Sequence, residues 1–257
     1  MIRVTSLATT PVKGLRLRPR DELALGLSGV PDNRCFYLID DRDRMLNGKQ
    51  VGALCTVVAD YDLATRELSM RFPDQTDVTG EVRLGEWVLS RFFSAPLHAR
   101  LVIGPWAEAL SAYAGRPLRL VAADPHRGAI DRGAAGAVSV ISRASVVRLE
   151  QLAGEREVDP RRFRMLIEVD GPAAHEEDDW VGRQVRIGEA LVAMRGHVGR
   201  CLVTTQDPET GQVDMPVLDM LRSYRSADET TEPLAFGIYG EVLEPGAVRV
   251  GDPVTPD

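Results

Sequence analysis

Cysteine, lysine, aromatic residues and long apolar runs are all scarce in this 257-residue chain. Its three cysteines form an odd set without a pairing rhythm, which argues against a disulfide framework and a zinc-finger spacing. There is no second cysteine cluster of the kind that holds an iron–sulfur cluster, so we expect none in this chain. No run of about eighteen uncharged apolar residues occurs, and we therefore expect no membrane-spanning helix and no membrane partner. Aromatic residues make up only 5% of the chain, which predicts an aliphatic core.

The net charge of the chain indicates whether nucleic acid is an expected partner. The formal net charge is −7, whereas nucleic-acid binding needs a surplus of Lys and Arg on the binding face, so we expect no nucleic-acid partner. A local basic pocket for one anionic cofactor remains compatible with this charge. Residues 1–5 lack the apolar run of a signal peptide, and we expect a cytoplasmic location.

Short β-branched segments separated by glycine and proline predict a mainly β chain with a few helices, an α+β fold built from barrels. Helices are indicated where apolar residues recur on one face and a cap residue follows or precedes them. The expected elements are strands at 1–9, 36–39, 237–241 and 247–250, helices at 106–115, 143–153 (N-cap Ser142) and 217–223, a glycine-rich linker at 126–136, and a solvent-exposed acidic run at 176–179.

One stretch, Gly199 to Gly211, carries the clearest chemical signal. Leu202–Thr205 is predicted to be a strand from its β-branched residues, and Asp207–Gly211 (Asp-Pro-Glu-Thr-Gly) is typical of a turn. Cys201 then lies at the mouth of the strand beside Arg200, whose fixed charge favours a thiolate, the form that acts as nucleophile or soft-metal ligand. Taken alone, the pattern is also consistent with a small buried cysteine beside a surface arginine.

Several further segments accompany this stretch. Leu-Arg-Ser-Tyr-Arg occupies 221–225, Phe-Gly follows at 236–237, and Val-Gly-Asp-Pro-Val occupies 250–254. Together with Gly199-Arg200-Cys201 and the Asp207–Gly211 turn, they resemble the MOSC domain family, in particular its amidoxime-reducing branch. The resemblance implies a two-part β-barrel protein, with an N-terminal MOSC-type barrel at residues 1–120 and the MOSC domain at residues 121–257.

The resemblance also implies a cofactor site. Cys201 corresponds to the residue that binds the molybdenum of the molybdenum cofactor (molybdopterin), and it becomes the expected metal ligand and catalytic residue. Where family members have hydroxyl groups, this chain has Gly14, Ala135 and Gly136, and Leu166 replaces an amide side chain. The residues expected to contact the cofactor are Lys13, Gly14, Arg34, Arg164, Gly199 and Arg200.

The function implied is an oxidoreductase that reduces N-oxygenated small molecules, such as N-hydroxylated amidines, with electrons from a separate redox protein. A second hypothesis is a sulfur carrier that uses a Cys201 persulfide, because MOSC domains also terminate molybdenum-cofactor sulfurases. Full sulfurases belong to a pyridoxal-phosphate-associated group, and a chain with only Lys13 and Lys49 as lysines does not fit that Schiff-base domain. A third hypothesis is a cofactor-binding or storage protein without turnover.

Overall fold

The computed structural model describes residues 1–92, 95–123 and 130–257. Its central feature is a closed barrel, in which seven strands follow the order β13-β12-β16-β15-β14-β18-β1 and β1 pairs back onto β13. Over these described residues the fold is mainly β with three α-helices, which confirms the predicted class. The barrel strands are β1 (Ile2–Thr9), β12 (Val138–Ser142), β13 (Ile167–Asp170), β14 (Gln184–Ile187), β15 (Ala190–Gly199), β16 (Ala235–Glu244) and β18 (Pro253–Pro256).

The barrel closes around aliphatic side chains that alternate along its strands. Val185 and Ile187 on β14 are fully buried, as are Val192 and Met194 on the antiparallel neighbour β15. This period of two is what a strand with one buried face requires. The short strand β2 (Arg18–Arg20) extends the barrel by pairing with β1. Two other short strands, β3 (Glu22–Leu25) and β17 (Gly246–Arg249), pair with each other in a two-stranded sheet.

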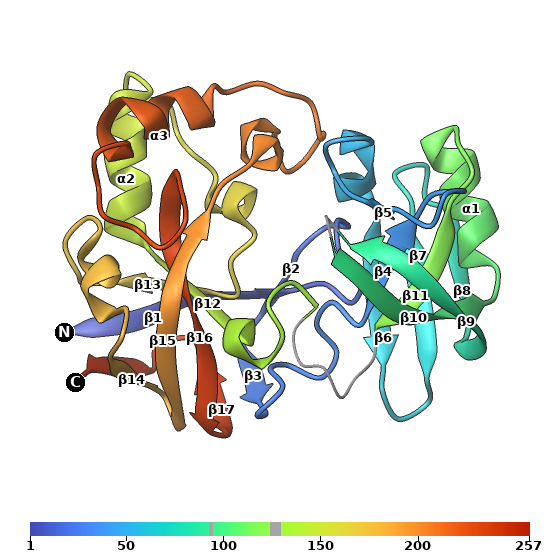
Figure 1. Ribbon diagram of the computed structural model, residues 1–257, viewed down its shortest axis with the longest axis horizontal. Helices are drawn as coiled ribbons and strands as arrows, with labels where there is room; N and C mark the ends of the chain where they lie inside the picture. Colours follow the sequence, from blue (N-terminus) through green and yellow to red (C-terminus); the bar gives the residue numbers. More distant parts are fainter. Residues whose placement is uncertain (93–94, 124–129) are drawn as a thin grey trace.

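The remaining strands form two separate sheets, which lie beside the barrel (Figure 1). Phe36, Leu68 and Leu120 belong to one apolar core between the two sheets. The first sheet has the order β5-β4-β11-β10-β9 and the second β6-β7-β8. Their bounds are β4 (Phe36–Ile39), β5 (Met45–Leu46), β6 (Val58–Asp62), β7 (Glu67–Arg71), β8 (Asp77–Glu81), β9 (Arg83–Phe92), β10 (Ala95–Ile103) and β11 (Arg119–Ala123).

The division into two domains near residue 120 remains a prediction. The strand pairing shows that the first strand of the chain contributes to the barrel formed by the C-terminal half. β1 comes from the start of the chain, yet it pairs with β13 and β18, whose residues come after position 160. The N-terminal segment therefore completes the barrel before the chain continues into the two sheets. Of the predicted linker, residues 126–129 lie outside the described residues, and Ala134–Gly136 form a short 3-10 helix (η3).

Each predicted helix is present, and its caps follow from the local sequence. Helix α1 (Trp106–Ala114) ends at Gly115, whose φ of 64° is the left-handed conformation that glycine adopts without strain. Helix α2 (Arg143–Leu152) begins at Ser142, whose hydroxyl accepts the Ser145 N–H. Helix α3 (Val217–Arg225) packs with α2 on the same side of the barrel (Figure 1). Among the described residues, no helix is long and apolar enough to cross a membrane.

The prediction that residues 176–179 are solvent exposed is wrong for Glu177. These residues lie in the 3-10 helix Glu176–Trp180 (η5), and the Glu177 side chain is completely buried. Its carboxylate accepts the Ser145 hydroxyl at 2.8 Å and the Ser142 N–H at 3.1 Å, at the first turn of α2. A buried carboxylate needs such donors. Glu177 therefore joins η5 to the start of α2.

His175, directly before η5, gives a testable pH dependence. Its ring packs against Tyr224 and Phe236, and burial, aided by Arg225 and Arg148, lowers its pKa from 6.5 to about 4. The unfolded chain therefore takes up a proton at a pH where the folded protein does not, and stability falls as the pH drops from 6.5 towards 4. Urea denaturation at several pH values should show a flatter decline for His175→Asn, because Asn also tolerates this left-handed backbone (φ 66°).

The matched control for this experiment is His98→Asn, because His98 is exposed on β10. It should follow the wild-type pH profile. If His175→Asn and the wild type lose stability in parallel between pH 6.5 and 4, His175 is not the group responsible.

Candidate functional site

A cavity of about 510 Å³ contains the chemical groups singled out by the sequence. Its walls come from the barrel, from the loops after β15 and before β4, and from residues 47–49 and 55 of the N-terminal region. Every residue expected to contact a cofactor lines this one cavity. The described residues that line it include Lys13, Gly14, Arg34, Cys55, Asp131, Arg132, Arg162, Arg164, Gly199, Arg200, Cys201 and Glu232.

Cys201 lies at the end of β15, where the chain leaves the barrel, and its side chain is exposed. The prediction that Leu202–Thr205 form a strand is wrong, since these residues form a 3-10 helix (η6). The hydroxyls of Thr204 and Thr205 donate to the carbonyls of Cys201 and Leu202, three residues back, at 3.0 and 2.6 Å. These local bonds favour a turn over a strand ladder. Cys201 therefore precedes a tight turn that fixes its backbone.

Arg200 lines the cavity, and its guanidinium is held by backbone carbonyls of the protein. Its guanidinium donates to the Phe163 carbonyl at 2.9 Å and, through Nε, to the Phe236 carbonyl at 2.8 Å. It also lies 5.4 Å from the Phe163 ring centre. Burial lowers its pKa to about 9, so it remains charged at neutral pH. The Arg200 side chain thus connects the backbone next to Cys201 to η4 (Pro160–Phe163) and to β16.

Lys13 enters the cavity from the turn after β1. Its backbone N–H donates to the Phe36 carbonyl at 2.8 Å, which fixes the turn against β4. Burial lowers the pKa of the Lys13 ammonium group, and Asp131 opposes that shift. Gly14 has a φ of +96°, a conformation that favours glycine, and a Cβ there would meet open space. A glycine here suits the sharp turn that brings Lys13 to the cavity wall.

Arg34 and Arg164 form the next part of the wall. Arg34 donates to the Arg164 carbonyl at 2.7 Å, and Arg164 donates to the Leu15 carbonyl at 2.6 Å. Both residues have a left-handed backbone, with φ of 54° and 53°. Burial and the neighbouring Arg34 charge lower the pKa of Arg164 to about 10. The two arginines therefore connect the loop before β4, the turn after β1 and the end of η4.

Asp131 is a cavity residue that the sequence did not indicate, as are Arg132 and Glu232. The Asp131 carboxylate accepts Lys13 Nζ at 2.5 Å and an Arg34 N–H at 2.7 Å. Burial opposes its ionisation, but the two cations outweigh that effect and hold the pKa of Asp131 well below its usual range. Asp131 lies in the stretch predicted to be a linker, and a polar residue in a linker does not by itself indicate a binding site.

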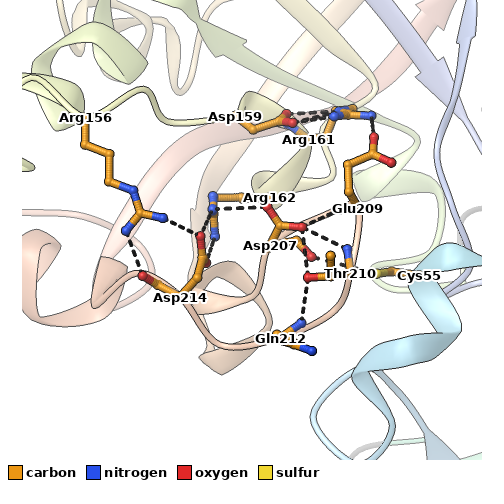
Figure 2. A network of polar contacts seen from close by, with 10 residues as sticks. All are labelled: Cys55, Arg156, Asp159, Arg161, Arg162, Asp207, Glu209, Thr210, Gln212 and Asp214. Carbon is orange, nitrogen blue, oxygen red and sulfur yellow. Dashed lines mark hydrogen bonds and ion pairs between the residues drawn. The ribbon is translucent and has the colours of Figure 1, made fainter.

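The Asp207–Gly211 turn is confirmed, and it belongs to a polar network beside the cavity (Figure 2). Asp207 accepts the N–H groups of Glu209 and Thr210 at 3.0 and 2.8 Å. Arg162 lies between Asp207 and Asp214, and both Asp214 oxygens accept its guanidinium at 2.7 Å (Figure 2). The network links η4, which precedes Arg164, to the loop that follows Cys201 and η6.

A protein-family model and several curated proteins are similar in sequence to this chain. The MOSC domain model matches residues 127–255. The mitochondrial amidoxime-reducing component 1 of Danio rerio is 32% identical over 98% of this chain and 83% of its own length. This chain belongs to the MOSC domain family. The barrel that β1 completes is therefore its MOSC barrel, and Cys201 lies where one strand of that barrel ends.

Further relatives match over different shares of their length. The mitochondrial amidoxime-reducing component 1 of Xenopus laevis is 28% identical over 98% of this chain and 81% of its own length. The human mitochondrial amidoxime reducing component 2 is 39% identical, but over 45% of this chain. That alignment spans 35% of the relative's length, about a third. The cytoplasmic location expected from the sequence is corrected by these comparisons, because the full-length relatives are named mitochondrial components.

The groups in the MOSC cavity fit an anionic, sulfur-ligated cofactor. The exposed thiol of Cys201 offers a soft donor, which in its thiolate form can ligate a metal. Lys13 and Arg34 place an ammonium and a guanidinium on one carboxylate, which is the donor pattern that also suits a phosphate. The cavity volume is within the range of small-molecule and cofactor sites, about 300–1,000 Å³.

Proposed function

We propose that this protein is an oxidoreductase that binds the molybdenum cofactor and reduces N-oxygenated small molecules with electrons from a separate redox protein. The observation that carries the proposal is the convergence of Cys201, Lys13, Arg34, Arg164 and Gly199 on one cavity. Full-length relatives named amidoxime-reducing components support the substrate class. When bound, the cofactor would supply a two-electron, oxo-transfer centre.

The chain's own residues would hold and orient that group. The Cys201 thiolate would bind the metal, while Lys13 and Arg34 would neutralise the anionic part of the cofactor. Arg164 and Arg200 donate to backbone carbonyls, so their role would be to fix the cavity walls and to contribute positive charge. Such preorganised charge lowers the cost of holding an anion without reorganisation on binding.

The experiment is to produce the protein in a host that makes the molybdenum cofactor and to measure molybdenum and pterin per chain. Reduction of benzamidoxime by an artificial electron donor then tests turnover. We expect about one molybdenum per chain and measurable reduction. Bound cofactor without turnover would instead favour the storage hypothesis, and metal-free protein with labile sulfur on Cys201 would favour the persulfide carrier, which the exposed thiol also permits.

A further inference from the structure

The carboxylate of Asp131 forms ion pairs with Lys13 and Arg34, the two cations that are expected to bind an anionic ligand. Oδ1 lies 2.5 Å from Lys13 Nζ, and Oδ2 lies 2.7 Å from an Arg34 nitrogen. The side chains of Asp131 and Lys13 are each only 16% exposed, so this is a largely buried ion-pair network. Desolvated charges of this kind interact more strongly than surface pairs, and an incoming anion has to compete with an established contact.

The backbone near Asp131 is held by a second ion pair. Arg132, the next residue, donates two N–H groups to the Glu232 carboxylate at 2.8 Å, and the same carboxylate accepts the Gly199 N–H at 2.9 Å. The Arg132 guanidinium also lies 4.7 Å from the Tyr239 ring centre. Release of Asp131 from Lys13 and Arg34 can therefore occur by rotation of its side chain while Arg132 keeps the segment on the barrel.

We propose that Asp131 is an internal competing anion, which must leave Lys13 and Arg34 before the phosphate monoester of a cofactor can bind there. The inference rests on the proposed function for the identity of the ligand, but not for the competition itself. Moving Asp131 off the two cations costs the same free energy whichever anion replaces it. Asp131 therefore lowers the affinity of Lys13 and Arg34 for every incoming anion, the dianionic phosphate group included.

Titration of the full chain with inorganic phosphate tests this competition without any metal. At about pH 8, where phosphate is mostly dianionic, isothermal titration calorimetry should show Asp131→Asn binding phosphate about tenfold more tightly than the wild type, because the competitor has lost its charge. Nitrate, which competes with the same carboxylate, should gain affinity by a similar factor. The gain in phosphate affinity should disappear in the double variant Lys13→Gln, Asp131→Asn.

The matched control is Asp43→Asn. Asp43 accepts Arg119 at 2.6 Å in a partly exposed ion pair outside the cavity, so the variant loses the same charge elsewhere. It should bind phosphate as the wild type does. The proposal is overturned if Asp131→Asn gains no affinity, if Asp43→Asn gains as much, or if neither the wild type nor Asp131→Asn binds phosphate.

A measurement on the wild type guards against a variant that fails to fold. The carboxyl ¹³C resonance of Asp131 should move as phosphate is added and should saturate with the calorimetric dissociation constant, while chloride at equal ionic strength leaves it in place. Phosphate binding that does not move this resonance contradicts the competition. Molybdenum content separates the failure of the proposed function from the failure of the role of Asp131. Metal-free protein whose Asp131→Asn variant binds phosphate more tightly rejects only the proposed function. Metal-loaded protein whose Asp131→Asn variant gains no phosphate affinity rejects only the role of Asp131.

Discussion

Cys201→Ser should remove molybdenum from protein produced in a cofactor-competent host and lower benzamidoxime reduction by at least about 100-fold. Losses of 10–100-fold follow removal of groups that merely orient a metal ligand, so removal of the ligand itself should cost no less. The free energy of unfolding should change by less than about 0.5 kcal/mol, because the Cys201 side chain is exposed. Elemental analysis, the reductase assay and urea denaturation measure these three quantities.

The control is Cys55→Ser, which removes a thiol from the same cavity wall. The Cys55 thiol is partly buried and donates to the Asp207 carbonyl at 3.9 Å. Burial raises its pKa, so it is poorly suited to ligate a metal. Its variant should keep molybdenum and activity. Retention of stoichiometric molybdenum by Cys201→Ser would show that the thiol is not the ligand.

Asp214→Ala should destabilise the protein by about 3 kcal/mol, the low end of the cost of breaking a buried ion pair. The Arg162 side chain is 3% exposed, and it donates to both Asp214 oxygens (Figure 2). Without the Asp214 carboxylate, the Arg162 guanidinium stays buried and keeps only Asp207, 3.9 Å away, as a carboxylate partner. Because that partner remains, we expect the cost to lie at the low end of the range. The measurement is the urea midpoint and slope, fitted to the free energy of unfolding.

Asp219→Ala is the matched control, since Asp219 pairs with Arg222 across one turn of α3 and both side chains are at least 60% exposed. Surface pairs of this kind contribute about 0–1 kcal/mol, so the change should be small. Equal losses in the two variants would show that burial of Arg162 does not determine the cost. Because η4 precedes Arg164, Asp214→Ala should also weaken phosphate binding.

The sequence predicted the parts of the fold that local chemistry determines. Gly115 and Ser142 signal helix ends through their own backbone and hydroxyl chemistry, and both helices are present. The Asp207–Gly211 turn is encoded in the same way. The β-branched residues 203–205 were ambiguous, because threonine hydroxyls can also bond back to carbonyls three residues earlier, and these residues form a 3-10 helix instead of a strand.

Contacts between distant segments could not be predicted. The ion pair of Lys13 with Asp131 joins residues 118 positions apart, and that of Arg132 with Glu232 joins residues 100 apart. Neither acid belongs to a motif, and an isolated acid in a polar stretch is normally solvated. The burial of Glu177 could not be predicted either, because it depends on hydrogen bonds from Ser142 and Ser145, which lie more than thirty residues earlier in the chain. The motif positions that line the cavity were identified, but the acids that neutralise some of them were not.

The most direct test of the central claim is to locate the metal. Crystals of the cofactor-loaded protein, measured on both sides of the molybdenum absorption edge, would give an anomalous difference map. We predict one strong peak per chain inside the cavity, within bonding distance of Cys201 Sγ. A peak at another site, or no peak in protein that contains stoichiometric molybdenum, would contradict the account.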